Sequence, residues 1–518
     1  MLPETNDRAA RGSPPGAQAS PRTRSLRGVA ALLAALGLAG CAQVVRQGGF
    51  EDVQKSVVER GVETPIAWRD EVGAADPSVA AAVDGVLARD LTADGAVQVA
   101  LLNNPSLQAE YEELGIAQAE VVQASLPKNP DFIGTTLFGG VSPAYDFDFA
   151  ESLLDALLIP SRKRIAGSAF DEVRLRVAGE VFDLAAHVRA AYFRLQAAEQ
   201  LVLVLTEAAD AAGASAEFAE RLQTAGNVSD LEVATQRALA ADVRTALLRA
   251  QADTVEPREE LRRLLGLSDS NQTFRVPPTL PALPPKEPGL EELRELAKQK
   301  RLELAAARQD REVVARTLET ANDWRYLGRI EPGAALHREQ GENNWIAGPS
   351  LSLEIPIFDQ RQAEIAGLEA RLRQSERRVE ALTQDVVAEV RRAWEELRAA
   401  RALAEHQRRT LIPARERVVE LSQHHYDYML LGTFDLLLAK REEIDAYRDY
   451  VEAVGAYWTR AAELERAVGT RIALRPAEEP AVKPRAPAAS SGSHGHHHHA
   501  PPPAAPEPAH PDHEHGGH

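Results

Sequence analysis

The sequence predicts a mostly α-helical protein with a small β part, organised as two copies of one pattern. Aromatic residues make up only 5% of the 518 residues, whereas Ala, Leu, Glu, Arg and Gln are abundant, which is typical of long helices. Short motifs recur in the same order about 200 residues apart, which indicates an internal two-fold repeat. Segments in which apolar and polar residues alternate stand at equivalent places in both copies, which predicts a few strands.

Composition and charge exclude several classes of protein. The formal net charge of −18 argues against a nucleic-acid partner, which needs a basic face. A single cysteine excludes a disulfide framework and a multi-cysteine zinc site. No pattern in the sequence is typical of a phosphate loop, a nucleophile with its base, or a paired-carboxylate site. We therefore expect no enzyme activity and no required cofactor.

Residues 1–40 are predicted to be an export signal peptide. A basic stretch precedes the apolar run Val29–Ala39, which is too short for a bilayer that needs about 20 residues. The run ends in Leu38-Ala39-Gly40-Cys41, which resembles the bacterial lipobox and implies lipid attachment at Cys41; an ordinary signal followed by a chance cysteine is the alternative. Residues 41–85 are then a lipidated N-terminal segment. Ala42 rather than Asp follows the cysteine, which implies the outer membrane of a Gram-negative bacterium.

Beyond this signal, no segment approaches about 18 consecutive apolar residues, so no transmembrane helix is predicted. A chain of this kind can cross a membrane only by strands.

Residues 86–268 and 291–470 are predicted to be the two repeats. Three pairs of segments match in order: Asn104–Tyr111 with Arg301–Arg308, Ile165–Gly167 with Ile365–Gly367, and Val188–Tyr192 with Val390–Trp394. The Pro-rich residues 269–290 between the repeats are predicted to form a semi-rigid linker. Residues 471–518 are predicted to be a disordered tail rich in His and Pro.

Each repeat is predicted to contain a short helix, two strands, a long helix, a glycine turn and a medium helix. Apolar residues recur at helical spacing, for example Val181, Val188 and Leu195. The two shorter helices, stacked end to end, match the length of the long one. Taken alone, the helices also fit an antiparallel coiled coil. The predicted helices are Pro105–Leu126, Arg162–Ala225 and Asp230–Leu265 in the first repeat, and Arg301–Asn322, Arg361–Leu431 (interrupted at Pro413) and Phe434–Val468 in the second.

The alternation of apolar and polar residues in other segments argues against a structure made only of coiled-coil helices. The segment Trp345–Phe358 has apolar residues at every second position, as in a half-buried strand. Tyr145–Phe149 alternates with aspartates in the first repeat, and strands at Phe132–Phe138 and Trp324–Leu336 are predicted to precede these two. Aromatic residues at strand ends suit a membrane interface. The candidate barrel residues are Phe132, Phe138, Tyr145, Phe147, Phe149, Trp324, Tyr326, Trp345, Leu351, Leu353, Ile355 and Ile357.

Four strands cannot close a membrane barrel, which needs at least about 8. Open sheet edges are not tolerated in hydrocarbon, so several chains are expected to share one barrel. Two chains would give eight strands and three would give twelve, and the strand count alone does not choose between them.

The chain resembles the TolC-like outer membrane factors over about residues 85–470. The resemblance lies in the duplicated layout, in Asn104-Pro105 followed by Leu-Gln-Ala, in Leu114–Ala119, and in the turns at Gly226 and Gly432. It implies a long α-helical barrel continuous with a transmembrane β-barrel shared by a homotrimer. It also implies the exit duct of a tripartite efflux system, with a periplasmic adaptor and an inner-membrane pump of the RND type as partners.

The resemblance places two glycine turns at the helical tips. Glycine at these turns is expected to permit a positive φ, and a plain helix C-cap is the alternative. One feature departs from the family. Family members often have a ring of aspartates several residues after the second tip glycine, and Asp435 stands about two residues before that position. We therefore do not assign a carboxylate gate to this chain. The residues expected at the adaptor contact or pore mouth are Gly226, Asn227, Asp230, Gly432, Thr433, Phe434 and Asp435.

The histidine-rich tail is predicted to bind a divalent metal loosely, because neutral imidazole is a preferred ligand for zinc, copper and nickel. An inert disordered tail is the alternative. The tail histidines are His494, His496, His497, His498, His499, His510, His513, His515 and His518.

The tail favours the heavy-metal branch of the resemblance, with copper, zinc, cobalt or nickel cations as cargo. Alternative functions are a drug-efflux or type I secretion duct of the same fold, and a non-channel periplasmic coiled-coil or metal-buffering lipoprotein.

Overall fold

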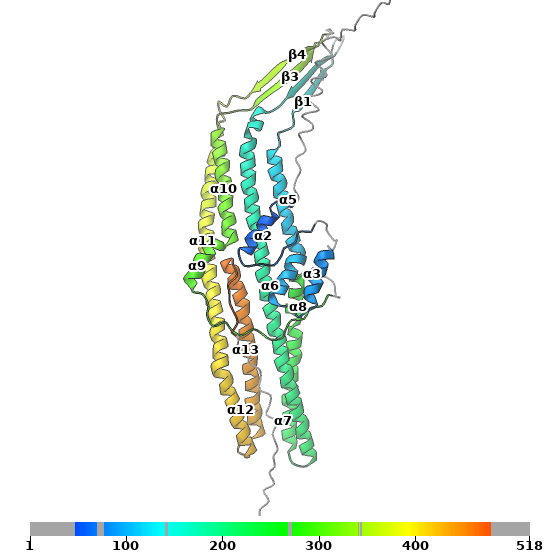
Figure 1. The fold of residues 1–518 in the computed structure, drawn as a ribbon, viewed down its shortest axis with the longest axis vertical. Helices are drawn as coiled ribbons and strands as arrows, with labels where there is room; N and C mark the ends of the chain where they lie inside the picture. Colours follow the sequence, from blue (N-terminus) through cyan, green and yellow to red (C-terminus); the bar gives the residue numbers. More distant parts are fainter. Residues whose placement is uncertain are drawn as a thin grey trace, which may run out of the picture.

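The computed structural model describes residues 47–69, 77–139, 143–267, 272–339, 341 and 344–477. Cys41 and the nine tail histidines lie outside these ranges. The described part is elongated, with a small sheet at one end and two helical hairpin turns at the other (Figure 1).

The longest element is helix α6 (Leu153–Thr224), which runs unbroken for 72 residues. The predicted start at Arg162 was wrong, because the helix begins before Pro160 and continues through it. Ser152 fixes the start, since its side chain accepts a hydrogen bond from the backbone N–H of Asp155 at 3.3 Å.

The long helix of the second half is divided in three. Helix α11 (Gln362–His406) passes through a π-helical turn, η1 (Gln407–Leu411), into α12 (Ile412–Asp427). The predicted interruption at Pro413 is confirmed, and the irregular turn lies just before it. Proline has no N–H for a helical bond, so the preceding turn widens. Helix α13 (Thr433–Val468) then returns along α11 and α12.

In the first half, α5 (Pro105–Ser125) precedes the strands, and α7 (Asp230–Asp253) and α8 (Val255–Leu264) follow α6. The prediction of one helix from Asp230 to Leu265 was wrong, because the chain breaks at Thr254. The break has a local cause in Pro257, which lacks an N–H. The Thr254 hydroxyl donates to the carbonyl of Gln251 at 2.7 Å and so occupies one helix-end acceptor.

The predicted end-to-end stacking of the shorter helices is confirmed in both halves. The amide of Asn104, at the start of α5, donates to the carbonyl of Leu264 at the end of α8, at 2.9 Å. The guanidinium of Arg301, at the start of α10 (Leu302–Asp323), donates to the carbonyl of Ala467 at the end of α13, at 3.0 Å. Two stacked helices therefore form each column beside a long one.

The four strands form one antiparallel sheet in the order β1-β2-β3-β4. They are β1 (Asp131–Leu137), β2 (Ala144–Ala150), β3 (Ile330–Arg338) and β4 (Ile346–Leu353). The β2–β3 pairing joins the two halves of the chain. Because paired residues share a face, the register gathers most of the large apolar side chains on one face and the carboxylates on the other, where Ile133 and Ile346 also lie. Phe132, Phe147, Phe149, Leu336, Leu351 and Leu353 share the apolar face, and Asp146, Asp148, His337 and Ser352 share the opposite face.

Six of the predicted barrel residues lie outside the strands: Phe138, Trp324, Tyr326, Trp345, Ile355 and Ile357. The prediction that β3 begins at Trp324 was wrong, because this residue caps the end of α10. Strand β4 ends earlier than predicted, before Pro356, which cannot donate to a ladder. In the single chain Leu351 is 68% exposed, so this chain alone does not cover the apolar face of β4. Trp345 still joins the aromatic row, with its ring 6.0 Å from that of Phe147.

The Pro-rich segment between the halves is held against three helices. Gln196 of α6 donates to the carbonyls of Pro277 and Thr279 at 3.0 and 2.9 Å. Trp458 of α13 donates to Pro281, and Trp394 of α11 donates to Pro288.

Shorter helices surround the middle of the molecule (Figure 1). These are α2 (Phe50–Val58), α3 (Pro77–Leu87), α4 (Ala93–Asn103) and α9 (Leu290–Lys300). Two large buried clusters form there. The first contains residues of α4, α5, α6 and α8, including the predicted core residues Val181, Val188 and Leu195, and the second contains residues of α9, α11 and α13. Within the described ranges, no helix is both long enough and apolar enough to cross a membrane.

Candidate functional site

The first hairpin tip is closed by Gly226, as predicted. Its φ is +77°, a left-handed conformation that glycine adopts without strain. Its N–H donates to the carbonyl of Gln223 at 2.8 Å, and the N–H of Asn227 donates to that of Leu222 at 2.9 Å. This pattern satisfies the free carbonyls at the end of α6. Ser229 then begins α7 by accepting from the N–H of Glu232 at 3.2 Å.

The second tip departs from the prediction. Gly432 has a φ of −78° and stands in extended backbone immediately before α13, so the expected positive φ was wrong for this residue. Met429 takes the left-handed conformation instead, with a φ of +56°. The N–H groups of Met429 and Leu430 donate to the carbonyls of Tyr426 and His425 at 2.8 and 2.9 Å. A non-glycine residue therefore carries the backbone strain of this turn.

A carboxylate connects the two tips. Oε1 of Glu232, in the first turn of α7, accepts hydrogen bonds from the hydroxyls of Tyr426 and Thr433, each at 2.7 Å. Burial raises the pKa of the Tyr426 phenol, and its hydrogen bond to Glu232 raises the pKa further. The first hairpin is thus joined to both helices of the second. Asp230, two residues earlier, accepts from Gln223 of its own hairpin at 2.6 Å.

The tip ends are otherwise apolar and exposed. Met429 is 94% exposed and Phe434 is 68% exposed. Large apolar side chains at a solvent-facing end of a molecule are typical of a surface that another protein covers. The exposed apolar residues of this end are Leu231, Tyr428, Met429, Leu430 and Phe434.

From the sequence, Glu232 was a further candidate for an acidic mouth beyond the first tip, with a solvated helix surface as the alternative, and Tyr426 was not identified. The motif Ser229-Asp-Leu-Glu232 has the form of a capping box, in which a carboxylate at this position reaches back to the preceding backbone. Here the carboxylate reaches the other hairpin instead. Thr433 was expected at the pore mouth or the adaptor contact, and its hydroxyl points to Glu232.

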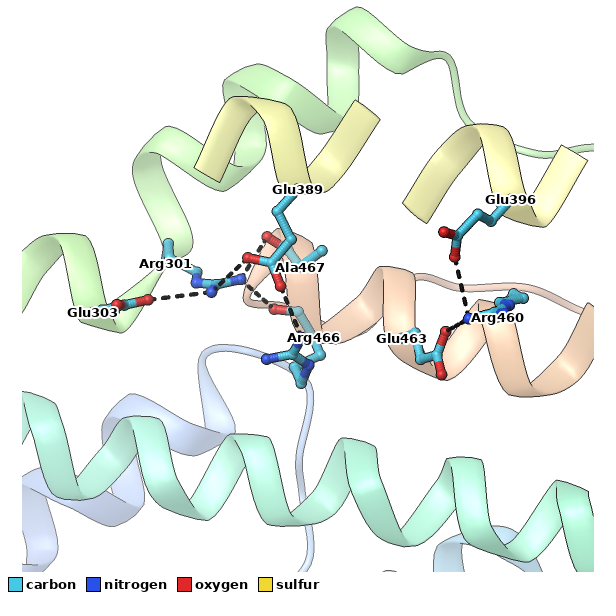
Figure 2. Close-up of polar contacts among 8 residues, drawn as sticks. All are labelled: Arg301, Glu303, Glu389, Glu396, Arg460, Glu463, Arg466 and Ala467. Atoms are coloured by element: carbon cyan, nitrogen blue, oxygen red, sulfur yellow. Dashed lines mark hydrogen bonds and ion pairs between the residues drawn. The ribbon is translucent and has the colours of Figure 1, made fainter. Parts of the chain in front are cut away.

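A second polar centre lies at mid-height, where α6, α10, α11 and α13 meet (Figure 2). The guanidinium of Arg301 donates to Glu389 of α11 at 2.8 Å, and Arg466 of α13 donates to the same carboxylate at 2.8 Å. Further along α13, Arg460 pairs with Glu396 at 3.2 Å and with Glu463 at 2.6 Å. These bridges connect α11 to the column formed by α13 and α10.

A buried ion pair fixes α6 against α13 nearby. Arg189 and Glu465 lie 3.3 Å apart, with side chains only 6% and 9% exposed. Burial raises the pKa of Glu465, although Arg189 and the N–H of Ile472 favour its charged form. Removing one partner of such a pair leaves a buried charge without compensation, which is strongly destabilising.

Comparison with known proteins identifies the family. Residues 160–267 and 293–470, more than half of the chain, match the family described as outer membrane efflux protein. The chain belongs to this family. The predicted resemblance to the TolC-like factors is thereby confirmed, and an outer membrane efflux protein of this kind is a channel rather than an enzyme.

Individual relatives of this outer membrane efflux protein are distant. The cobalt-zinc-cadmium resistance protein CzcC of Cupriavidus metallidurans is 24% identical over 386 residues, which cover 73% of this chain and 90% of the relative. Protein CyaE of Bordetella pertussis is 28% identical over 410 residues, covering 73% and 84%. A solved structure of CusC has a TM-score of 0.61 at 16% identity and covers 74% of this chain and 92% of its own, which shows the same fold.

Among the residues that the structure describes, no group of three His, Cys, Asp or Glu side chains is close enough to hold a metal ion.

Proposed function

We propose that three copies of this chain form the outer-membrane exit duct of a tripartite efflux system, which conducts its substrate passively to the exterior. In this proposal, the three four-stranded sheets close one twelve-stranded barrel, and the helices below it form a continuous α-helical barrel. The two halves of the chain are the products of an internal duplication, in keeping with their shared order of helices and strands.

The observation that carries the proposal is the small sheet at the end of the long helices. Within the described residues, the outer strands β1 and β4 are each paired on one side only, in the order β1-β2-β3-β4. One face is mostly apolar and the other carries Asp146, Asp148 and His337. Each unpaired backbone group in hydrocarbon costs several kcal/mol, about 2–7 for an amide. Pairing β1 of one copy with β4 of the next removes both edges and leaves the apolar face toward lipid.

The periplasmic partners are proposed to bind at the other end. The exposed apolar residues around Met429 and Phe434 suit a periplasmic adaptor, which connects the duct to an inner-membrane pump of the RND type. Lipid on Cys41 would anchor each copy in the outer membrane.

Heavy-metal cations such as copper, zinc, cobalt or nickel are the proposed cargo. The support is the printed name of the relative CzcC, a cobalt-zinc-cadmium resistance protein, together with the histidines after residue 490. The tail is proposed to bind a divalent metal loosely at the periplasmic surface. If the chain is truncated at residue 490 and metal tolerance of the cells does not change, the tail has no such role.

Two arginine substitutions on neighbouring residues of β4 test the duct. Leu351 lies on the apolar face and Ser352 on the opposite face, and both are exposed in the single chain. An arginine on the lipid face of a barrel costs about 2–4 kcal/mol at the bilayer midplane, whereas lumen substitutions are tolerated. We expect Leu351→Arg to abolish ion conductance in planar bilayers and Ser352→Arg to retain it. Equal conductance of the two variants contradicts the proposal.

A further inference from the structure

The two columns of stacked helices are joined by different chemistry. Where α8 meets α5, the contacts are made by side-chain amides. Asn103 donates to the carbonyls of Leu265 and Gly266 at 3.1 and 2.8 Å, and Asn104 donates to Leu264. Arg69, from the loop after α2, supports Asn103 by donating to its amide oxygen at 2.8 Å. We call these contacts the amide joint.

Where α13 meets α10, the contacts are made by charges. Arg301 donates to the carbonyls of Arg466 and Ala467, each at 3.0 Å, and to Glu389 at 2.8 Å. The guanidinium of Arg466 is held by the other oxygen of Glu389, also at 2.8 Å (Figure 2). These contacts are called the ionic joint.

Both joints follow a helix that ends at a glycine with a positive φ, so the main difference between them lies in the side chains. Gly266 and Gly469 end their helices with φ of +69° and +77°. A Cβ on Gly266 would lie 2.5 Å from the carbonyl oxygen of Asn103, and one on Gly469 would lie 2.9 Å from Cα of Arg301. Each helix end is therefore in close contact with the start of the next.

Glu389 compensates two positive charges at the ionic joint, and the amide joint has no such pair of charges. It is shared by two guanidinium groups that belong to the two stacked helices. Without its charge, Arg301 and Arg466 repel each other across the joint. Glu303 also pairs with Arg301, at 3.2 Å, but its side chain is 58% exposed and so is strongly screened.

Other titratable groups that face the ionic joint come from α6. Asp183 is close enough to interact electrostatically with Arg466, Arg301 and His187, and His187 lines a cavity together with Glu389 and Arg466. Burial raises the pKa of Asp183, while Arg466 and Arg301 favour its charged form. Asp183 forms a weaker counter-charge than Glu389, which bonds both guanidinium groups directly.

We propose that the ionic joint is a hinge: Glu389 clamps Arg301 to Arg466, and screening or removal of its charge releases the end of α13 from the start of α10 while the amide joint stays closed. The adjacent elements fit this movement. Helix α6 is unbroken and serves as a fixed support, whereas α11 passes into α12 through the π-helical turn Gln407–Leu411, where its backbone bonds are already irregular.

Amide hydrogen exchange on the full-length protein tests the hinge in two arms. In the first arm, Glu389→Gln is compared with Glu303→Gln, a matched loss of one carboxylate charge from the same network. We expect exchange at least about tenfold faster at Ala467–Ile472 and Arg301–Ala305 in Glu389→Gln only, because a charge-assisted hydrogen bond is lost at each arginine. Exchange at Arg262–Leu267 and Asn104–Gln108, in the amide joint, should not change.

In the second arm, the unmodified protein is measured at low and high salt. We expect salt to accelerate exchange at the ionic joint and not at the amide joint, and we expect Glu389→Gln to lose this salt dependence. If amide exchange is accelerated equally at both joints, the effect is a general destabilisation of the protein. If it is accelerated at neither joint, Glu389 does not stabilise the contact between α13 and α10. Either result overturns the hinge, whether or not the protein conducts ions.

Discussion

Tyr426 and Glu232, separated by 194 residues, share a hydrogen bond of 2.7 Å at the end of the molecule where both hairpins turn. Thr433 donates to the same carboxylate oxygen, so one side chain of α7 holds the end of α12 and the start of α13. The two hairpins belong to different halves of the chain, and this contact is where their tips meet.

Replacing Tyr426 with Phe is expected to loosen the tips, because the ring is kept and only the bond to Glu232 is lost. Spin labels on the exposed positions Asn227 and Met429 can report the distance between the tips. We expect a longer and broader distance distribution in Tyr426→Phe. Glu220→Gln is the control, since Glu220 pairs with Arg237 inside the first hairpin. A distribution that both variants leave unchanged would show that the contact does not hold the tips together.

High pH should have the same effect in the unmodified protein. The pKa of Tyr426 is raised in the folded state, so the protonated phenol is favoured by folding. The stability from this group is complete below the unfolded tyrosine pKa of about 10 and is lost as pH rises through the folded pKa. The tip distance should therefore lengthen only above about pH 10. Tyr426→Phe should show no such transition, and a transition that persists in this variant would assign it to another group.

Replacing Arg189 with Met should destabilise the fold by about 3–5 kcal/mol at neutral pH, because a buried carboxylate is left unpaired. The pKa of Glu465 is already raised by burial and should rise further without its partner. A carboxyl group with a raised folded pKa binds more protons in the folded state, so stability should increase as pH falls through that pKa. Urea unfolding over a series of pH values measures this. Arg460→Met, at a more exposed pair, should show a small loss that does not depend on pH.

Replacing Gly455 with Ala should destabilise the packing of α6 against α13 by about 1–3 kcal/mol, which is typical of overpacking. A Cβ at this position would lie 2.4 Å from Cβ of Ala197. Thermal or urea unfolding measures the loss, and the second change Ala197→Gly should restore part of it. Gly213→Ala is the matched control, because nothing lies within 4 Å of its Cβ position in α6, and it should stabilise by about 0.5–1 kcal/mol. A stabilising Gly455→Ala would contradict the close approach of these helices.

The two tip glycines should differ when replaced by alanine. Gly226 has a positive φ, so Gly226→Ala should cost about 1–2 kcal/mol. Gly432 is extended, with a φ of −78°, so Gly432→Ala should be nearly neutral. Equal losses in urea unfolding would mean that the second tip is turned at Gly432 after all and not at Met429.

Local signals in the sequence predicted most of the helices, because helix ends depend on nearby residues. Asn104 followed by Pro105 predicted the start of α5, and its side chain accepts from the N–H of Leu107 as a cap does. Pro257 gave the same kind of signal for the break between α7 and α8, but the prediction did not use it. Trp324 was assigned to a strand from its residue type, although the three residues before it continue the helix pattern of α10.

The sequence alone determined the helical class, the order of elements in the two halves and the apolar alternation of the strands, because these follow from spacing along the chain. Only the tertiary structure decided that Glu232 joins the hairpin tips, that Arg301 and Glu389 connect two stacked helices, and that Met429 replaces Gly432 as the strained residue. Each of these contacts depends on side chains brought together from distant positions or on how a turn is held by its neighbours. No local pattern specifies such partners, since the same Glu, Arg or Gly is equally compatible with a solvated helix surface.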